Sequence, residues 1–217
     1  MTDREDRTPA WNDPAESGEA DGPDEPHPDL ADVPDWDDEY LDRVSDRLMH
    51  SYDLEKSYRE GPERFDMYGR LRVENQKHLF HPALNWANHR AEEHLYVRRV
   101  DGVGKADLES LVELGHRLAD ERIDADEEHF RTDFTFVVVA PRVSPEVASY
   151  VADFSDRTML KFGYYGQYEV NLAVAVPDGK RVVASESADV ADAFALWDPV
   201  EREPSGLLDR LLGRLKA

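Results

Sequence analysis

The sequence predicts an α+β fold: an antiparallel or mixed sheet of about five strands, with helices packed mainly on one face. Three observations lead to this prediction. Helical periodicity dominates the first part of the chain, several short strand patterns follow one another in the second part, and residues 134–140 are apolar at every position but one. Such a run is typical of a central strand buried on both faces. Helices and strands that are segregated along the chain favour α+β over an alternating α/β fold.

Composition divides the 217 residues into three parts. Residues 1–34 are rich in Asp, Glu, Pro and Gly, and we expect a disordered acidic tail, because such a segment buries too little apolar surface to offset the entropy of ordering. Residues 35–198 are expected to form a single α+β domain. Residues 199–217 are expected to be a linker followed by an amphipathic helix.

The first predicted element is a helix over residues 35–52, with Asp35 as its N-cap. Its apolar residues recur every three or four positions, as in a helix that buries one face. They are Trp36, Tyr40, Leu41, Val44 and Leu48. Residues 65–74 then alternate apolar and polar side chains, which predicts a strand with one buried face.

Two helices are expected before the central strand. Pro82 suits the first position of a helix over 82–100. Residues 108–122 have the most regular amphipathic pattern in the chain, which predicts a second helix. The acid-rich residues 124–133 are expected to form a solvated loop.

The elements after the central strand are expected to be short. Ser144 and Pro145 suit the start of a helix over 144–154. Gly166 is expected to be a turn or bulge between two strands, and residues 177–179 a hairpin turn. The remaining predicted elements are strands over 159–165, 168–176 and 181–185 and a short helix over 190–197.

Charge is the most unusual property of the composition. The chain has 48 acids and 26 bases, a net charge of -22, with only six lysines and no cysteine. The missing cysteine excludes disulfides, thiolate nucleophiles and cysteine-based metal sites. The acidity opposes binding to nucleic acid, so we expect no nucleic-acid partner. No run approaches the roughly 18 apolar residues of a membrane span, and the first residues lack an apolar leader, so we expect a cytoplasmic protein without a transmembrane segment.

Residues 64–99 contrast with the rest of the chain, because they carry seven bases, four acids and four of the eight histidines. This local excess of positive charge leads us to expect a binding surface. The candidate binding residues are Arg70, Arg72, Asn75, Lys77, His78, His81, Asn85, Asn88, His89 and Glu92. The function that we expect is therefore that of a binding or interaction protein.

A metal-assisted hydrolase is the alternative function. A helix over 82–100 would place His89 and Glu93 one turn apart, and such a pair can share a divalent metal. The alternative site would be built from His78, His81, His89 and Glu92 or Glu93. The chain contains no HExxH zinc motif, no GxSxG, no phosphate loop and no GxGxxG. We therefore expect no resident metal or cofactor, and keep His89 and Glu93 as the metal candidates.

Two further segments suggest contacts. The aromatic residues between Lys161 and Tyr168 could stack on bases, but strand aromatics more often pack within a sheet, and packing is what we expect. The segment 207–216 places five leucines on one helical face (Leu207, Leu208, Leu211, Leu212 and Leu215). This face could dock on the chain's own domain, on a protein partner or second copy, or on a membrane.

The acidic composition over the whole length, together with the Asn- and His-rich stretch 74–94, resembles uncharacterised haloarchaeal proteins of unknown function. Such a surface keeps a protein soluble in concentrated salt. The resemblance implies an environment and carries no activity or site residue with it.

Overall fold

The structure is a computed structural model of the whole chain, and it describes residues 34–75 and 89–198. The chain divides into two units, Met1–Asp32 and Val33–Ala217. The first unit lies outside the described residues, as do the two segments 76–88 and 199–217. The predictions of a disordered tail and of a C-terminal leucine helix therefore concern residues that are not described.

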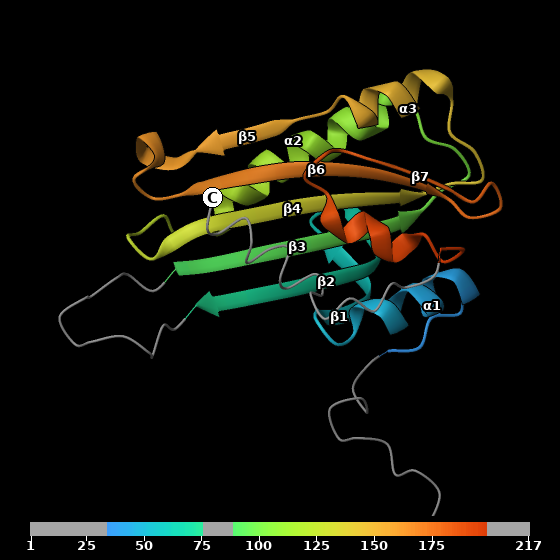
Figure 1. Cartoon of the computed structure of the whole chain (residues 1–217), viewed down its shortest axis with the longest axis horizontal. Helices are drawn as coiled ribbons and strands as arrows, with labels where there is room; N and C mark the ends of the chain where they lie inside the picture. Colours follow the sequence, from blue (N-terminus) through green and yellow to red (C-terminus); the bar gives the residue numbers. More distant parts are fainter. Residues whose placement is uncertain (1–33, 76–88, 199–217) are drawn as a thin grey trace, which may run out of the picture. The chain divides into compact units, whose positions relative to one another are not determined.

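The described part of the second unit is a mixed sheet with helices (Figure 1). Its strands are β1 (Asp53–Glu60), β2 (Glu63–Asn75), β3 (His89–Arg99), β4 (His129–Val139), β5 (Asp156–Met159), β6 (Gln167–Val176) and β7 (Arg181–Ala184). Its helices are α1 (Glu39–Leu48), α2 (Lys105–Arg122), α3 (Pro145–Ala152) and the 3-10 helices η2 (Leu160–Gly163) and η3 (Asp189–Phe194).

The seven strands follow the order β1-β2-β3-β4-β6-β5, and β7 pairs with β6 on the same edge as β5. The three central strands β3, β4 and β6 are parallel, and the remaining pairs are antiparallel. The prediction of an α+β fold with a mixed sheet is confirmed, but seven strands replace the expected five. The two additional strands are β1, at the edge, and β3, in a region predicted to be helical.

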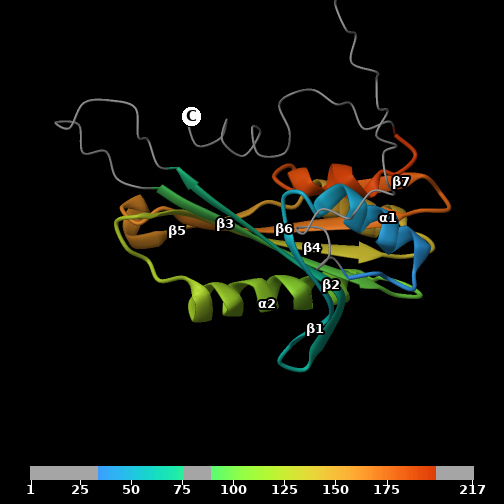
Figure 2. The same ribbon diagram turned by 90° about the horizontal axis from the view of Figure 1, so that it is seen from below.

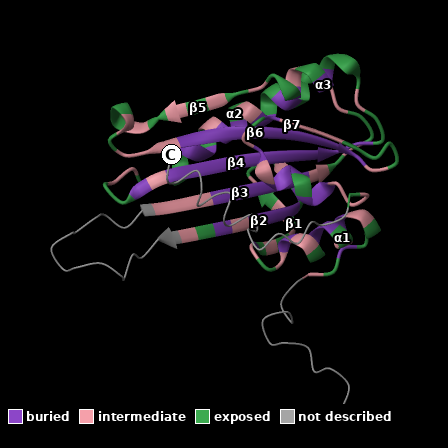
Figure 3. Ribbon diagram, viewed as in Figure 1, coloured by how far each residue is buried: buried purple, intermediate pink, exposed green. Residues whose placement is uncertain are grey.

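Helices cover both faces of the sheet, so the expectation that they pack mainly on one face is wrong. Figure 2 shows α2 on one face and α1 with η3 on the other. Two apolar clusters correspond to these faces: Leu108, Leu111 and Leu118 of α2 pack with the even-numbered residues of β4 and β6, whereas α1 and η3 pack with Val137, Val139 and the alanines of β6. Both faces of the central strands are therefore buried, as Figure 3 shows for β4 and β6.

The predicted helix over 82–100 is the clearest error in the described part of the chain. Residues 89–99 form β3, antiparallel to β2 and parallel to β4. This segment contains good helix formers, but Leu95 and Val97 face one cluster while Tyr96 faces the other. The apolar side chains of this segment thus alternate between the two faces of the sheet, as in a strand. Hydrogen bonding to β2 and β4 on its two sides outweighs the helix propensity of its single residues.

The aromatic segment also differs from its prediction. Residues 159–165 were expected to be a strand, but β5 ends at Met159 and a 3-10 turn follows. Tyr168 packs in the core as expected, whereas Phe162 and Tyr164 are almost fully exposed. Lys161 and Phe162 have positive φ angles of 46° and 60°, which are incompatible with an extended strand.

Candidate functional site

Three buried carboxylates lie side by side on the α1 face of the sheet. Glu93 on β3 is in register with Asp133 on β4, which is in register with Glu169 on β6. Neighbouring strands are about 4.8 Å apart, so side chains in register on one face are close neighbours. The three residues are 6%, 3% and 2% exposed. We call Glu93, Asp133 and Glu169 the carboxylate row.

Glu93 receives two neutral hydrogen bonds. The hydroxyl of Tyr52 donates to Oε2 at 2.8 Å, and Thr135 Oγ1 donates to Oε1 at 3.1 Å. Tyr52 follows α1 and lies outside the sheet, so its hydrogen bond ties Glu93 to the segment after α1. Burial raises the pKa of Glu93, because these neutral donors only partly replace the water that an ionised carboxylate loses.

Arg131 joins the other two members of the row. Its Nε donates to both carboxylate oxygens of Asp133, at 2.8 and 2.7 Å, and its Nη2 donates to Glu169 Oε2 at 3.0 Å. Glu169 also accepts hydrogen bonds from Arg157 Nε at 2.6 Å and Gln167 Nε2 at 3.2 Å. Glu169 therefore accepts hydrogen bonds from two arginines and a glutamine, while Asp133 shares Arg131 with it.

The charges of the row do not balance. Three carboxylates face the two guanidinium groups of Arg131 and Arg157, which leaves a formal charge of -1 when all are ionised. Burial raises the pKa of Asp133 to about 7, although Arg131 opposes this shift, and the neighbouring Glu93 adds to it. The row can therefore gain or lose a proton near neutral pH, and a bound cation would compete with that proton.

Asn171 supplies an unused donor beside the row. It is 2% exposed and lies two residues along β6 from Glu169, in register with Thr135. Its Oδ1 accepts a long hydrogen bond from Ser185, but its Nδ2 has no partner within the part of the chain that the structure describes. A buried donor without an acceptor costs roughly 1–3 kcal/mol, and such groups occur at sites completed by a ligand or water.

The sequence-predicted arginines lie on the opposite face. Arg70 Nη2 and Arg72 Nε both contact Glu92, at 3.0 and 3.1 Å. Burial opposes ionisation of Glu92, but the hydrogen bond from Arg70 and the positive charges of both arginines lower its pKa. Three more arginines of the stretch 64–99 are paired with acids, as Arg90–Glu128, Arg98–Glu63 and Arg99–Asp38. The positive charge of this stretch is thus largely offset by acids from other segments.

Only some of the other predicted site residues are among those that the structure describes. Asn75 pairs with His89 at the end of the β2–β3 ladder. Five candidates lie outside the described residues: Lys77, His78, His81, Asn85 and Asn88. The binding role of these residues stays a prediction.

His89 and Glu93 were proposed as a metal pair because a helix would place them one turn apart, but both lie on strand β3. Four residues span roughly 13 Å along a strand, compared with about 6 Å along a helix. Glu92 and Glu93 face opposite sides of the sheet, because the first contacts Arg70 and the second contacts Tyr52. Within residues 34–75 and 89–198, no group of three or more His, Asp or Glu is arranged to hold a metal ion.

His94 is a buried titratable residue that the sequence did not single out. Its Nδ1 is 2.7 Å from the hydroxyl of Tyr68, and its ring stacks on Phe134. Burial lowers the pKa of His94 to about 4, an effect that Arg122 strengthens. His94 is therefore neutral at pH 7, and its 3.6 Å contact with Glu92 is not an ion pair there.

Residues 37–196 match the family described as a domain of unknown function, DUF8052. The chain belongs to this family. No curated protein and no solved structure matches it. The comparisons thus leave the function of the DUF8052 domain unknown. Among the described residues, no helix is long and apolar enough to cross a membrane.

The carboxylate row of this DUF8052 domain was missed because its members lie far apart in sequence. Asp133 falls in the predicted acidic loop, and Glu93 in a predicted helix. A signal was present at Glu169, which lies between the strand residues Tyr168 and Val170. An acid inside an apolar strand indicates a paired or functional carboxylate, but one strand alone does not reveal its partners.

Proposed function

We propose that this protein binds a small organic cation at the carboxylate row. One observation carries the proposal: three carboxylates are buried in register on adjacent parallel strands, with two guanidinium groups to balance them. Burying an unbalanced charge is unfavourable, so the arrangement lowers stability unless another cation completes it. Sites that sacrifice stability in this way are commonly functional.

The chemistry of the row favours an organic cation over a metal ion. Arg131 already lies between Asp133 and Glu169, so a metal would have to displace a buried guanidinium. Glu93 accepts hydrogen bonds from neutral hydroxyls, which an ammonium or guanidinium group could join. The unpartnered Nδ2 of Asn171 adds a requirement for an acceptor oxygen on the ligand. The ligand class is therefore a small molecule with one positive group and one hydroxyl or carboxyl group.

Isothermal titration calorimetry with ethanolamine tests this proposal, because ethanolamine carries one ammonium and one hydroxyl group. Ethylene glycol is the matched probe without the charge. We expect ethanolamine, but not ethylene glycol, to bind the wild-type protein at pH 8, and both Glu93→Gln and Asp133→Asn to remove the binding. Glu113→Gln on the exposed side of α2 is the control for general attraction to an acidic protein.

Two outcomes would contradict the proposal. Equal loss in Glu113→Gln would mean that ethanolamine responds only to the overall negative charge. Absence of binding of ethanolamine and of guanidinium chloride to the wild-type protein at pH 8 would leave the row with a structural role. The earlier hydrolase alternative has less support, because the described residues provide no three-ligand metal group.

The proposal also covers the cellular location of the protein and the salt concentration in which it works. We infer a soluble cytoplasmic protein of a halophile, supported by the net charge of -22 and the scarcity of lysine. We also propose that the leucine face of residues 207–216 binds a protein partner or a second copy of the chain. Measuring the unfolding midpoint from 0.1 to about 3 M KCl tests the halophile inference, since screening should stabilise so acidic a chain. A midpoint that does not rise with KCl would contradict it.

A further inference from the structure

The turn between β5 and β6 concentrates the exposed apolar surface of the described chain. Met159, Phe162 and Tyr164 are 57%, 98% and 85% exposed, and they are the large apolar residues classed as exposed among those that the structure describes. All three fall within six residues. We call residues 159–165 the aromatic turn. Clustered exposed apolar residues indicate a contact surface, whereas single ones do not.

The aromatic turn is held in one conformation. Leu160 N donates to Gly166 O at 2.9 Å, and Tyr165 N donates to Leu160 O at 3.3 Å. The carbonyl of Tyr165 is 2.7 Å from His129 Nδ1, which ties the turn to the start of β4. Phe162 has φ of +60°, an unfavourable angle for a residue with a side chain. A strained turn that projects a phenylalanine into water is pre-organised for contact.

Charge restricts what the aromatic turn can contact. Arg157 is paired with Glu169, but the aromatic turn itself contains Lys161 and no acid, although the whole chain has 48 acids. This local excess of positive charge favours an apolar recess bordered by carboxylates.

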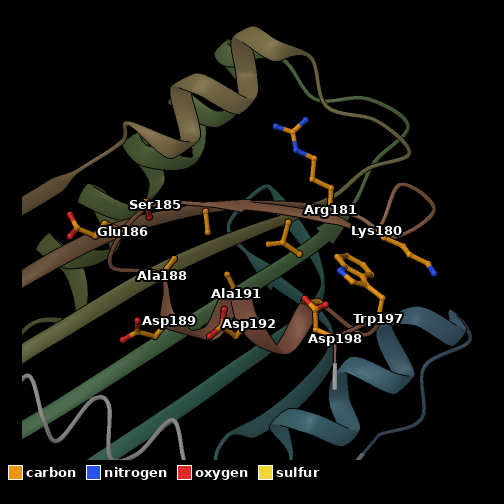
Figure 4. A pocket seen from close by; sticks show the side chains of 13 residues that line it. Lys180, Arg181, Ser185, Glu186, Ala188, Asp189, Ala191, Asp192, Trp197 and Asp198 are labelled. Carbon is orange, nitrogen blue, oxygen red and sulfur yellow. The ribbon is translucent and has the colours of Figure 1, made fainter. Parts of the chain in front are cut away.

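The same chain carries a recess of this kind. A pocket of about 480 Å³ lies between β7 and η3 (Figure 4). Its apolar lining is formed by Val182, Ala184, Ala188, Ala191, Ala195 and Trp197. Four acids and two bases also line it, for a formal charge of -2: Glu186, Asp189, Asp192, Asp198, Lys180 and Arg181. We call it the β7–η3 pocket.

The aromatic turn cannot reach the β7–η3 pocket of its own chain. The turn adjoins Gln167 at the start of β6, whereas β7 pairs with residues 173–176 at its end. At about 3.3 Å per residue, these positions are roughly 20–30 Å apart along a rigid strand. A contact between the two features must therefore join two molecules.

We propose that the aromatic turn of one molecule docks in the β7–η3 pocket of a second copy, with Phe162 in the apolar recess and Lys161 beside its acids. The contact joins two different surfaces, so it builds a ring or an open chain, or a two-fold dimer if both contacts form at once. It is separate from the carboxylate row and does not depend on ligand binding there. Because each copy carries a charge of -22, association strengthens as KCl screens the repulsion between copies.

Sedimentation velocity over a concentration series, at 0.15 and at about 2 M KCl, tests this proposal. We expect the wild-type protein to self-associate, and Phe162→Ala to weaken the association about tenfold or more, given the apolar area of a phenyl ring. Phe162→Tyr should retain most of it. Asp192→Lys should weaken it at the pocket, whereas Glu113→Lys, the same charge change on exposed α2, should not.

Complementation separates docking from loss of structure. Ala195→Trp fills the pocket but leaves the turn intact, and Phe162→Ala removes the turn residue but leaves the pocket intact. We expect each variant alone to associate about tenfold more weakly than the wild-type protein or worse, and an equimolar mixture to form a heterodimer at concentrations where each variant alone is monomeric. Circular dichroism confirms that both variants are folded.

Three results would overturn the proposal. The first is a wild-type protein that stays monomeric up to about 1 mM in both salts. The second is a mixture of the two variants that stays monomeric. The third is binding of a monomeric wild-type chain to phosphatidylglycerol vesicles that Phe162→Ala removes, which would make the turn a lipid contact.

Discussion

Glu93 and Asp133 lie in register on adjacent parallel strands, both buried, and within residues 34–75 and 89–198 only Asp133 has an arginine partner. In a parallel pair, such neighbours point to the same face, so the two carboxylates repel each other where little water screens them. The pKa of each is raised, with burial as the main cause. This pair is therefore an unfavourable element that the rest of the fold stabilises.

The pH dependence of stability should reveal Asp133. Its pKa is about 7 in the folded protein and near 3.8 in the unfolded chain, so the folded state holds a proton that unfolding releases between these values. Stability therefore falls as pH rises through 7, and we expect a decrease of about 1 kcal/mol in unfolding free energy from pH 6.5 to 8. Urea unfolding at the two pH values measures it. Asp133→Asn should remove the decrease, and Glu113→Gln should keep it.

Replacing Glu93 should stabilise the protein. In Glu93→Gln the amide still pairs with the hydroxyls of Tyr52 and Thr135, while an uncompensated buried charge disappears. We expect the unfolding free energy at pH 8 to rise by about 1 kcal/mol, as at sites that favour function over stability. Urea unfolding of both proteins at pH 8 checks this. A decrease of similar size would assign Glu93 a structural role.

His94 should act at lower pH and in the opposite sense. Its pKa is about 4 when folded and near 6.5 when unfolded, so the unfolded chain binds a proton first as pH falls. Its contribution to stability is complete above pH 6.5 and is lost on acidification toward pH 4. We expect the wild-type protein to lose about 2 kcal/mol more than His94→Gln between pH 6.5 and 4.5. Equal losses in a urea titration would show that His94 remains accessible to protons.

The parts of the fold that the sequence predicts best are those with one strong periodicity. The helix over 108–122 and the strand over 134–140 appear as α2 and β4. A regular apolar stripe with helical spacing predicts a helix, and a short apolar run predicts a strand buried on both faces. The edge strand β1 escaped prediction, since Asp53–Glu60 contains only two large apolar residues, Leu54 and Tyr58. This segment is a strand because it pairs with β2, and the residues of the segment alone do not show that pairing.

The candidate site was less predictable for a related reason. The carboxylate row exists only because β3, β4 and β6 align at one register, and a shift of one residue would turn its members to the other face. No single segment encodes that alignment. The stretch 64–99 did draw attention to β2 and β3, and Glu93 was named there as a metal candidate, but its expected partner was His89 rather than Asp133.

The aromatic turn should depend on Gly166 more than on any of its exposed residues. Gly166 has φ of +74°, and a Cβ there would lie 2.2 Å from the carbonyl oxygen of Phe130, a backbone atom that cannot move aside. Gly166→Ala should therefore combine left-handed strain with a steric clash and lower the unfolding free energy by about 3 kcal/mol. Gly102 has an open surrounding and no positive φ, so Gly102→Ala is the matched control and should change stability by less than about 0.5 kcal/mol. Thermal unfolding of the two variants beside the wild-type protein compares them, and equal midpoints in all three would mean that the turn and the start of β4 are not packed as the structure shows.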